Sequence, residues 1–187
     1  MKRNLFITAT VCLLFGLLQS CGGNNSKKAE TDSAQKINET VKPVDEKSSK
    51  FAVEAANGGM SEVAMGKLAQ EKATNPRVKA FGTMMVNDHT KINDELKSLA
   101  ATLNVTLPAS INPEEQKHLD ELAKKSGKDF DKEYIMMMVE DHDMDVKAFE
   151  EASQNLTNTD IKAFANNTLA TLKVHQDSAK AIKAALK

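Results

Sequence analysis

The stretch that decides the fold runs from Val78 to Leu99 and has the sequence VKAFGTMMVNDHTKINDELKSL. Its apolar residues recur at steps of three and four, which is the spacing of one buried helical face: Val78, Phe81, Met85, Ile92, Leu96 and Leu99. His89 falls on the same stripe, where a helical bundle would normally place Leu. The stretch therefore predicts a packed helix that carries a titratable group on its buried face.

Helical patterns continue through the rest of residues 51–187, and no run alternates with period two for long. We expect long helices over about 49–73 and 76–103, a loop over 104–112, a short helix over about 113–125, and two further long helices after it. Asn75-Pro76, Asn112-Pro113 and Asn158 are typical helix starts, and Glu115 is placed to close a capping box. Gly58-Gly59 and Gly66 indicate either close approach of a neighbouring helix or a kink.

An internal repeat supports a bundle of two helical hairpins. Residues 62–81 align without a gap on residues 145–164, with identities that include Val63/Val146, Asn75/Asn158 and the Lys-Ala-Phe of 79–81 and 162–164. Two similar hairpins joined by a long connection is the construction of ferritin-type bundles. The sequence therefore predicts an all-α, ferritin-like four-helix bundle, in which the short helix after Pro113 forms the crossover.

One polar group from each long helix is expected at a similar height in this bundle. Glu62 lies 13 residues before Asn75 and His89 lies 14 after it, whereas His142 lies 16 before Asn158 and His175 lies 17 after it. At about 1.5 Å per residue, all four groups fall near mid-height. Imidazoles and a carboxylate are ligands for a divalent metal or copper, and Asp88 and Asp141 could orient the rings from behind.

A core feature without metal is the alternative interpretation of this layer, because a buried His is often simply hydrogen-bonded to a neighbour. Methionines cluster toward the same level and suit either Cu(I) or the filling of an irregular core: Met60, Met65, Met84, Met85, Met136, Met137, Met138 and Met144. Glu115 and His118 have the Glu-x-x-His spacing of di-iron bundles, but they sit in the connector, so we interpret the match as coincidence.

Several motifs resemble a widespread family of exported bacterial domains of unknown function: Gly58-Gly59-Met60-Ser61-Glu62-Val63, Lys67-Leu68-Ala69, Val78-Lys79-Ala80-Phe81, Met85 to Lys91 and Leu119 to Leu122. The resemblance covers about residues 51–186 and implies a ferritin-like helical fold. Members are often described as outer membrane proteins, and the family implies no reaction. A ferroxidase centre is not expected, because the residues three before His89, His142 and His175 are not Glu.

Residues 1–20 have the pattern of a lipoprotein signal peptide. Lys2 and Arg3 precede an apolar run over 5–18 that is short for a membrane span. The following Leu18-Gln19-Ser20-Cys21 resembles the bacterial lipoprotein box, which implies that Cys21 is acylated and starts the mature protein. The alternative is an ordinary secretory signal with a chance cysteine. Because Gly22 replaces the Asp that retains many such proteins at the inner membrane, the resemblance implies the outer membrane, on its periplasmic side or the cell surface.

Residues 21–50 are predicted to be the lipidated Cys and a flexible tether to the domain at 51–187. From Gly22 to Lys50 there is no aromatic residue, and the aliphatic residues other than Ala are Ile37, Val41 and Val44. Cys12 leaves with the signal and Cys21 carries lipid, so no cysteine chemistry remains for the domain.

Charge and composition exclude some partners and leave two hypotheses for function. The domain carries a small excess of acidic residues and the chain has no Trp, so nucleic acid is not an expected partner. No motif for a hydrolase is present, and whether the protein is an enzyme stays open, as do its protein partner and a homo-oligomeric state. The first hypothesis is a structural or interaction module of the cell envelope. The second is a metal-binding or redox bundle that uses Glu62, His89, His142 and His175.

Overall fold

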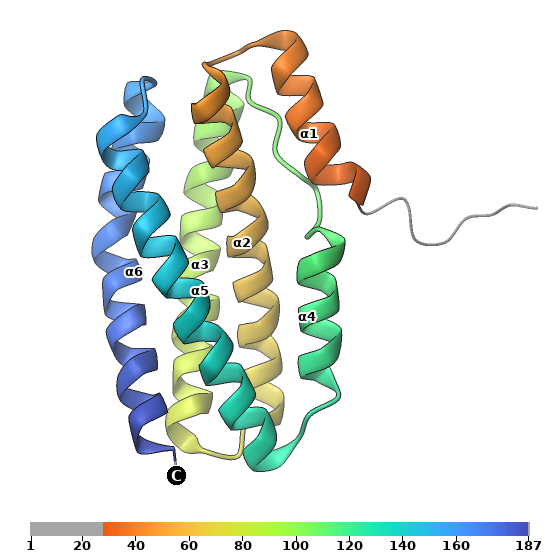
Figure 1. The fold of residues 1–187 in the computed structure, drawn as a ribbon, viewed down its shortest axis with the longest axis vertical. Helices are drawn as coiled ribbons and strands as arrows, with labels where there is room; N and C mark the ends of the chain where they lie inside the picture. Colours follow the sequence, from red (N-terminus) through yellow and green to blue (C-terminus); the bar gives the residue numbers. More distant parts are fainter. Residues whose placement is uncertain (1–27, 187) are drawn as a thin grey trace, which may run out of the picture.

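The computed structural model describes residues 28–186, and each regular element in that part of the chain is an α-helix (Figure 1). The elements are α1 (Lys28–Val41), α2 (Glu46–Lys72), α3 (Pro76–Leu103), α4 (Pro113–Ala123), α5 (Gly127–Asn155) and α6 (Thr159–Ala185). The all-α prediction is confirmed. The predicted signal peptide at 1–20 and the lipidated Cys21 lie outside the described residues. Among the helices of 28–186, none is both long and apolar enough to cross a membrane.

Two antiparallel hairpins form the bundle. α2 packs most extensively on α3, and α5 packs most extensively on α6, while α3 contacts α6 and α2 contacts α5. Figure 1 shows that α4 runs back along the bundle beside α2, so that α5 starts at the same end as α3 and runs parallel to it. This is the expected four-helix arrangement with a short crossover helix.

Asparagine side chains cap three of the helices as predicted. The side chains of Asn75, Asn112 and Asn158 accept hydrogen bonds from the first backbone N–H groups of α3, α4 and α6. The capping box predicted at α4 is only half formed. The backbone N–H of Asn112 donates to Oδ1 of Asn57, and the carboxylate of Glu115 accepts from the Ser61 hydroxyl at 2.7 Å instead of turning back to Asn112. Both contacts fasten the crossover to α2.

Glycines allow α2 and α3 to approach each other closely. A Cβ atom added at Gly82 would lie 2.7 Å from Cβ of Ala69 and 2.9 Å from the carbonyl oxygen of Gly66. Of the two alternatives for the glycines of α2, close approach is therefore correct at Gly66. The helix runs without interruption through Gly58 and Gly59, so there is no break at these residues.

The tether predicted over 21–50 is corrected where the structure describes it. Residues 28–41 form α1, and α2 begins at Glu46. Ala34 and Asn38 are buried, and the Asn38 side chain makes two hydrogen bonds with the backbone of Thr106, at 2.9 and 2.8 Å. The composition of the segment alone predicted disorder, but these contacts with the loop after α3 supply the partners that the segment itself lacks.

Two apolar clusters fill the bundle, one on each side of its middle. One cluster contains Met65, Met85, Met138 and Ala179, and the other contains Ala56, Leu96, Val146 and Leu172. On each of the four long helices the polar residue of interest lies between members of the two clusters: Glu62 on α2, His89 on α3, His142 on α5 and His175 on α6. A polar layer is thereby enclosed between two apolar ones.

Candidate metal centre

Four long helices each contribute one side chain to the polar layer. Glu62 is 3% exposed, His89 is 2% exposed, and both His142 and His175 are fully buried. Such groups are costly to bury unless their polar atoms are paired. The sequence prediction selected these same four residues, and the structure brings them together.

Each imidazole is oriented by an acceptor on its outer side. Nδ1 of His142 lies 2.9 Å from the carbonyl oxygen of Met138, which can only accept, so this nitrogen carries the proton. Nε2 of His175 lies 3.1 Å from Oδ2 of Asp88. Nδ1 of His89 lies 2.8 Å from Oε2 of Glu62. These three contacts favour one tautomer for each ring.

The opposite ring nitrogens are thereby left as acceptors that point into the bundle. Nε2 of His142 lies 3.3 Å from Nδ1 of His175, and Nε2 of His89 is buried without a hydrogen-bond partner. One nitrogen from each of His89, His142 and His175 lies within 4.8 Å of the others. Oε1 of Glu62 also lacks a donor and lies 3.5 Å from Nε2 of His142. Lone pairs that converge without a proton between them are a suitable ligand set for a cation.

Burial keeps the imidazoles neutral. It lowers the pKa of His89 to about 4. Burial, together with the neighbouring histidines, lowers the pKa of His142 to about 3. Burial also lowers the pKa of His175, against the effect of its hydrogen bond to Asp88. Neutral imidazole is the form that binds a metal ion, so the site needs no deprotonation of these rings near neutral pH.

Carboxyl groups adjoin the histidines on the side of α4 and α5. Burial raises the pKa of Glu62 to about 8 and the pKa of Asp145 well above its usual range, and the charge of Glu62 raises the pKa of Asp145 further. Burial and the charge of Glu62 also raise the pKa of Asp141 to about 8. The buried hydroxyl of Tyr134 has no hydrogen-bond partner among the described residues.

The two aspartates predicted to orient the rings have different positions. Asp88 does orient an imidazole, but it is that of His175 on α6 and not that of its neighbour His89. Asp141 has no hydrogen bond to any of the three rings among the described residues, and its pKa is raised by burial and by the charges of Glu62 and Asp145. Asp145 was missed, although the internal repeat aligns it with Glu62.

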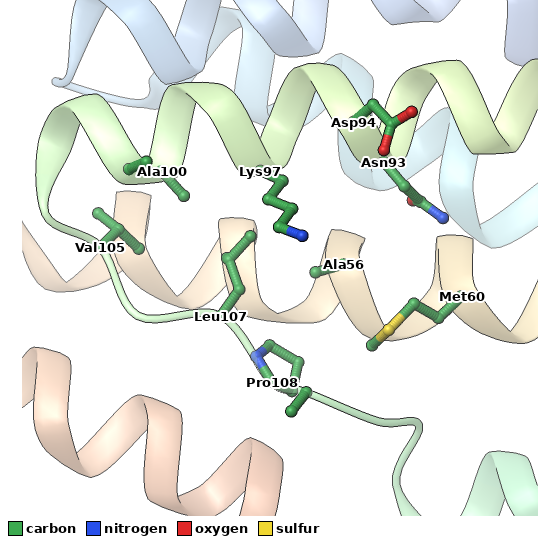
Figure 2. Close-up of a pocket in the computed structure, with 11 residues that line it drawn as sticks. Ala56, Met60, Asn93, Asp94, Lys97, Ala100, Val105, Leu107 and Pro108 are labelled. Carbon is green, nitrogen blue, oxygen red and sulfur yellow. The ribbon is translucent and has the colours of Figure 1, made fainter.

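A separate hollow of about 540 Å³ lies between α2, α3 and the loop that follows α3. Figure 2 shows Met60, Lys97, Leu107 and Pro108 around it. Its lining is mostly apolar and includes none of the three histidines. The cluster of three histidines is therefore not part of this hollow.

Comparison with known proteins shows the family. The model of a domain of unknown function, DUF4142, matches residues 32–182. The chain belongs to the DUF4142 family. The predicted resemblance to a family of domains of unknown function is thus confirmed for the family itself. The match includes most of α1. A comparison with curated proteins gives no match for this DUF4142 chain.

Two solved structures share the fold of this DUF4142 domain. A DUF305 fragment from Deinococcus radiodurans has a TM-score of 0.66 at 9% identity and covers 75% of this chain and 97% of its own. A structure described as CopM in the Cu(II)-bound form has a TM-score of 0.64 at 18% identity, with the same two coverages, 75% and 97%. At these identities the likeness shows the fold alone.

Proposed function

We propose that this DUF4142 domain binds one transition-metal ion through His89, His142 and His175. The observation that carries the proposal is that one buried ring nitrogen from each of three histidines lies within 4.8 Å of the others. The outer contacts of His142 and His175 leave their facing nitrogens as acceptors, and Nε2 of His89 has no hydrogen-bond partner among the described residues. Glu62 supports the set in two ways: Oε2 contacts the ring of His89, and Oε1 is a fourth donor atom beside His142. This arrangement favours the metal-binding hypothesis over a purely structural module.

Copper is the first metal to test. Imidazole ligands suit Cu, Zn, Fe and Ni, and among divalent ions of this series copper binds most tightly to a given site. The similar fold of a protein described as Cu(II)-bound supports the same choice. A copper ion bound at this nitrogen-rich site would either be stored there or supply one-electron redox chemistry. The residues of this chain would hold the rings, exclude water and keep the imidazoles neutral.

Native mass spectrometry of the tag-free protein, stripped with a chelator and then reconstituted, tests the proposal. We expect one Cu(II) per chain in the wild type, with nitrogen hyperfine structure in the electron paramagnetic resonance spectrum. The His142→Leu variant should lose both signals, and Asn166→Leu should keep them because Asn166 is exposed on α6. Less than a tenth of an equivalent of each tested metal in folded wild type would overturn the proposal.

We also propose that the domain acts in the cell envelope, attached through a lipid on Cys21. The support is the sequence pattern of residues 1–21, in which an apolar run over 5–18 is followed by Gln19, Ser20 and then Cys21. Growth of expressing cells with a radiolabelled fatty acid should label the wild type but not the Cys21→Ser variant. An unlabelled wild-type chain that is exported would contradict the proposal.

A further inference from the structure

A second group of metal-ligand side chains lies on the outside of the bundle, in a groove between α4 and α5. The groove has a volume of about 710 Å³. Its lining includes thioethers, an imidazole and carboxylates, from Met136, Met137, Met144, His118, Glu140 and Asp141. We call it the methionine groove. None of its thioethers or its imidazole belongs to the buried metal centre.

The thioethers of this groove lie along α5 in two groups. Met136 and Met137 are followed one turn later by Glu140 and Asp141, and two turns later by Met144. Residues three or four apart on a helix have Cβ atoms about 5–6 Å apart, so Glu140 and Asp141 lie between the two groups and next to both of them. His118 comes from α4, on the other wall.

These methionines differ from those of the core. Met65, Met85 and Met138 are buried and fill the apolar interior, as methionines commonly do. In contrast, Met136 is 38% exposed and Met144 is 64% exposed. Core filling therefore does not explain Met136 and Met144, whereas Met137 packs partly against the apolar core. Exposed thioethers that share a groove with an imidazole form a set of soft ligands.

The charge of the groove also suits a cation. Three glutamates line it, against two lysines: Glu121, Glu133 and Glu140, against Lys124 and Lys125. Asp141 adds a further negative charge only at higher pH, because burial raises its pKa to about 8. Thioethers prefer soft ions such as Cu(I), while imidazole and carboxylate accept them less selectively. The mixture of soft ligands with a local negative charge is not explained by the packing of α4 on α5.

We propose that the methionine groove binds a soft monovalent cation, Cu(I), at a site that is separate from the three-histidine centre. The thioethers of Met136, Met137 and Met144 supply the soft ligands, and His118 supplies an imidazole. This site does not depend on the proposed function of the buried centre, because the two share no ligand. Asp141 lines the groove, and the charge of Glu62 contributes to its raised pKa.

Silver(I) is an air-stable probe with the same ligand preference, and methionine methyl groups report its position by NMR. With methyl-labelled protein, we expect the resonances of Met136, Met137 and Met144 to shift together and to saturate near one equivalent of Ag(I). Met60 and Met84 are matched controls, because both are partly buried methionines outside the groove, and their resonances should stay in place. The same response in the His142→Leu variant would show independence from the buried centre.

Substitution tests the ligands directly. Leu has nearly the volume of Met but no thioether, so Met144→Leu, at the most exposed of the three positions, should keep the fold and weaken Ag(I) binding about tenfold or more. The Met60→Leu control should bind as the wild type does. Competition with a chromogenic Cu(I) chelator should give the same order of affinities, with Met144→Leu weaker than the wild type and Met60→Leu. Methyl resonances of Met136, Met137 and Met144 that do not move, or that move no more than those of Met60 and Met84, would overturn the proposal.

Discussion

Nε2 of His142 lies 3.3 Å from Nδ1 of His175, and the outer contacts of the two rings assign a lone pair to each of these nitrogens. The protons of both rings are on their far sides, where Met138 and Asp88 accept them. Two acceptors in contact are unfavourable in a dry interior unless a cation lies between them. This relationship separates a metal site from a hydrogen-bonded structural core, and it leads to the first prediction.

Replacing His142 by Leu should remove metal binding without loss of stability in the metal-free protein. Leu fits the volume of the site and removes the facing lone pairs, so the free energy of unfolding of the metal-free protein should stay within about 1 kcal/mol of the wild type or increase. The measurement is denaturant unfolding with and without one equivalent of Cu(II). Wild type should gain stability from the ion by linkage, and the variant should gain none.

The opposite outcome would identify a structural network. If His142 were part of a satisfied set of hydrogen bonds, its removal would leave buried partners unpaired and cost about 1–3 kcal/mol. Asn166→Leu, on the exposed surface of α6, controls for the introduction of a leucine as such.

Asp88 should control metal affinity through His175. Its carboxylate accepts from Nε2 of that ring, which keeps Nδ1 free for the ion. In Asp88→Ala the ring can rotate or change tautomer, so metal affinity should fall about 10–100-fold, as for other residues that hold a ligand from behind. Isothermal titration with Cu(II) measures the change. Asp94→Ala, an exposed aspartate on the same helix, is the control and should bind as the wild type does; equal losses in both variants would contradict this role for Asp88.

The buried histidines make the stability of the metal-free protein depend on pH. In the native state the pKa of His142 is lowered to about 3, below its ordinary value of 6.5, so the unfolded chain binds this proton first as the pH falls. The stability contributed by the neutral ring is therefore present above pH 6.5 and is lost progressively toward pH 3. Between pH 8 and pH 5 the loss from this one group is at most about 2 kcal/mol.

Comparison with His142→Leu isolates this contribution. Since the carboxyl groups with raised pKa, such as Glu62, are present in both proteins, their opposite dependence on pH largely cancels in the difference. Wild type should lose stability relative to His142→Leu as the pH is lowered from 6.5 to 5. Parallel pH profiles of the two proteins would contradict the lowered pKa of His142.

The heights of the four polar residues could be predicted from the sequence because an α-helix advances by a constant rise. Counting from Asn75 and Asn158 placed Glu62, His89 and His142 at one level, and the helix caps gave the starting points. The same regularity made the helix boundaries predictable to within a few residues. The same count placed His175 at that level.

Contacts between helices could not be predicted in this way. Which helix Asp88 would reach depends on the rotation of α3 against α6, and a stripe on one helix does not report that rotation. The order of α1 also depends on a partner far away in sequence, Thr106, which Asn38 contacts. Composition describes a segment without the partners that it contacts in the fold, and it therefore predicted a flexible tether where α1 forms.

The contact between α2 and α3 leads to a prediction about Gly82. A methyl group at this position would meet Cβ of Ala69 at 2.7 Å and the backbone oxygen of Gly66 at 2.9 Å, so the two helices would have to move apart. Gly82→Ala should therefore destabilise the protein by about 1–3 kcal/mol, even though Ala is the better helix former.

Gly58→Ala is the matched control, because a Cβ at Gly58 in the interior of α2 meets nothing within 4 Å and should add up to about 1 kcal/mol of stability. Denaturant unfolding of both variants measures the difference. Equal stabilisation by the two substitutions would show that α2 and α3 are not packed closely at Gly66 and Gly82, and the alignment of Glu62 with His89 across the same interface would then lose its support.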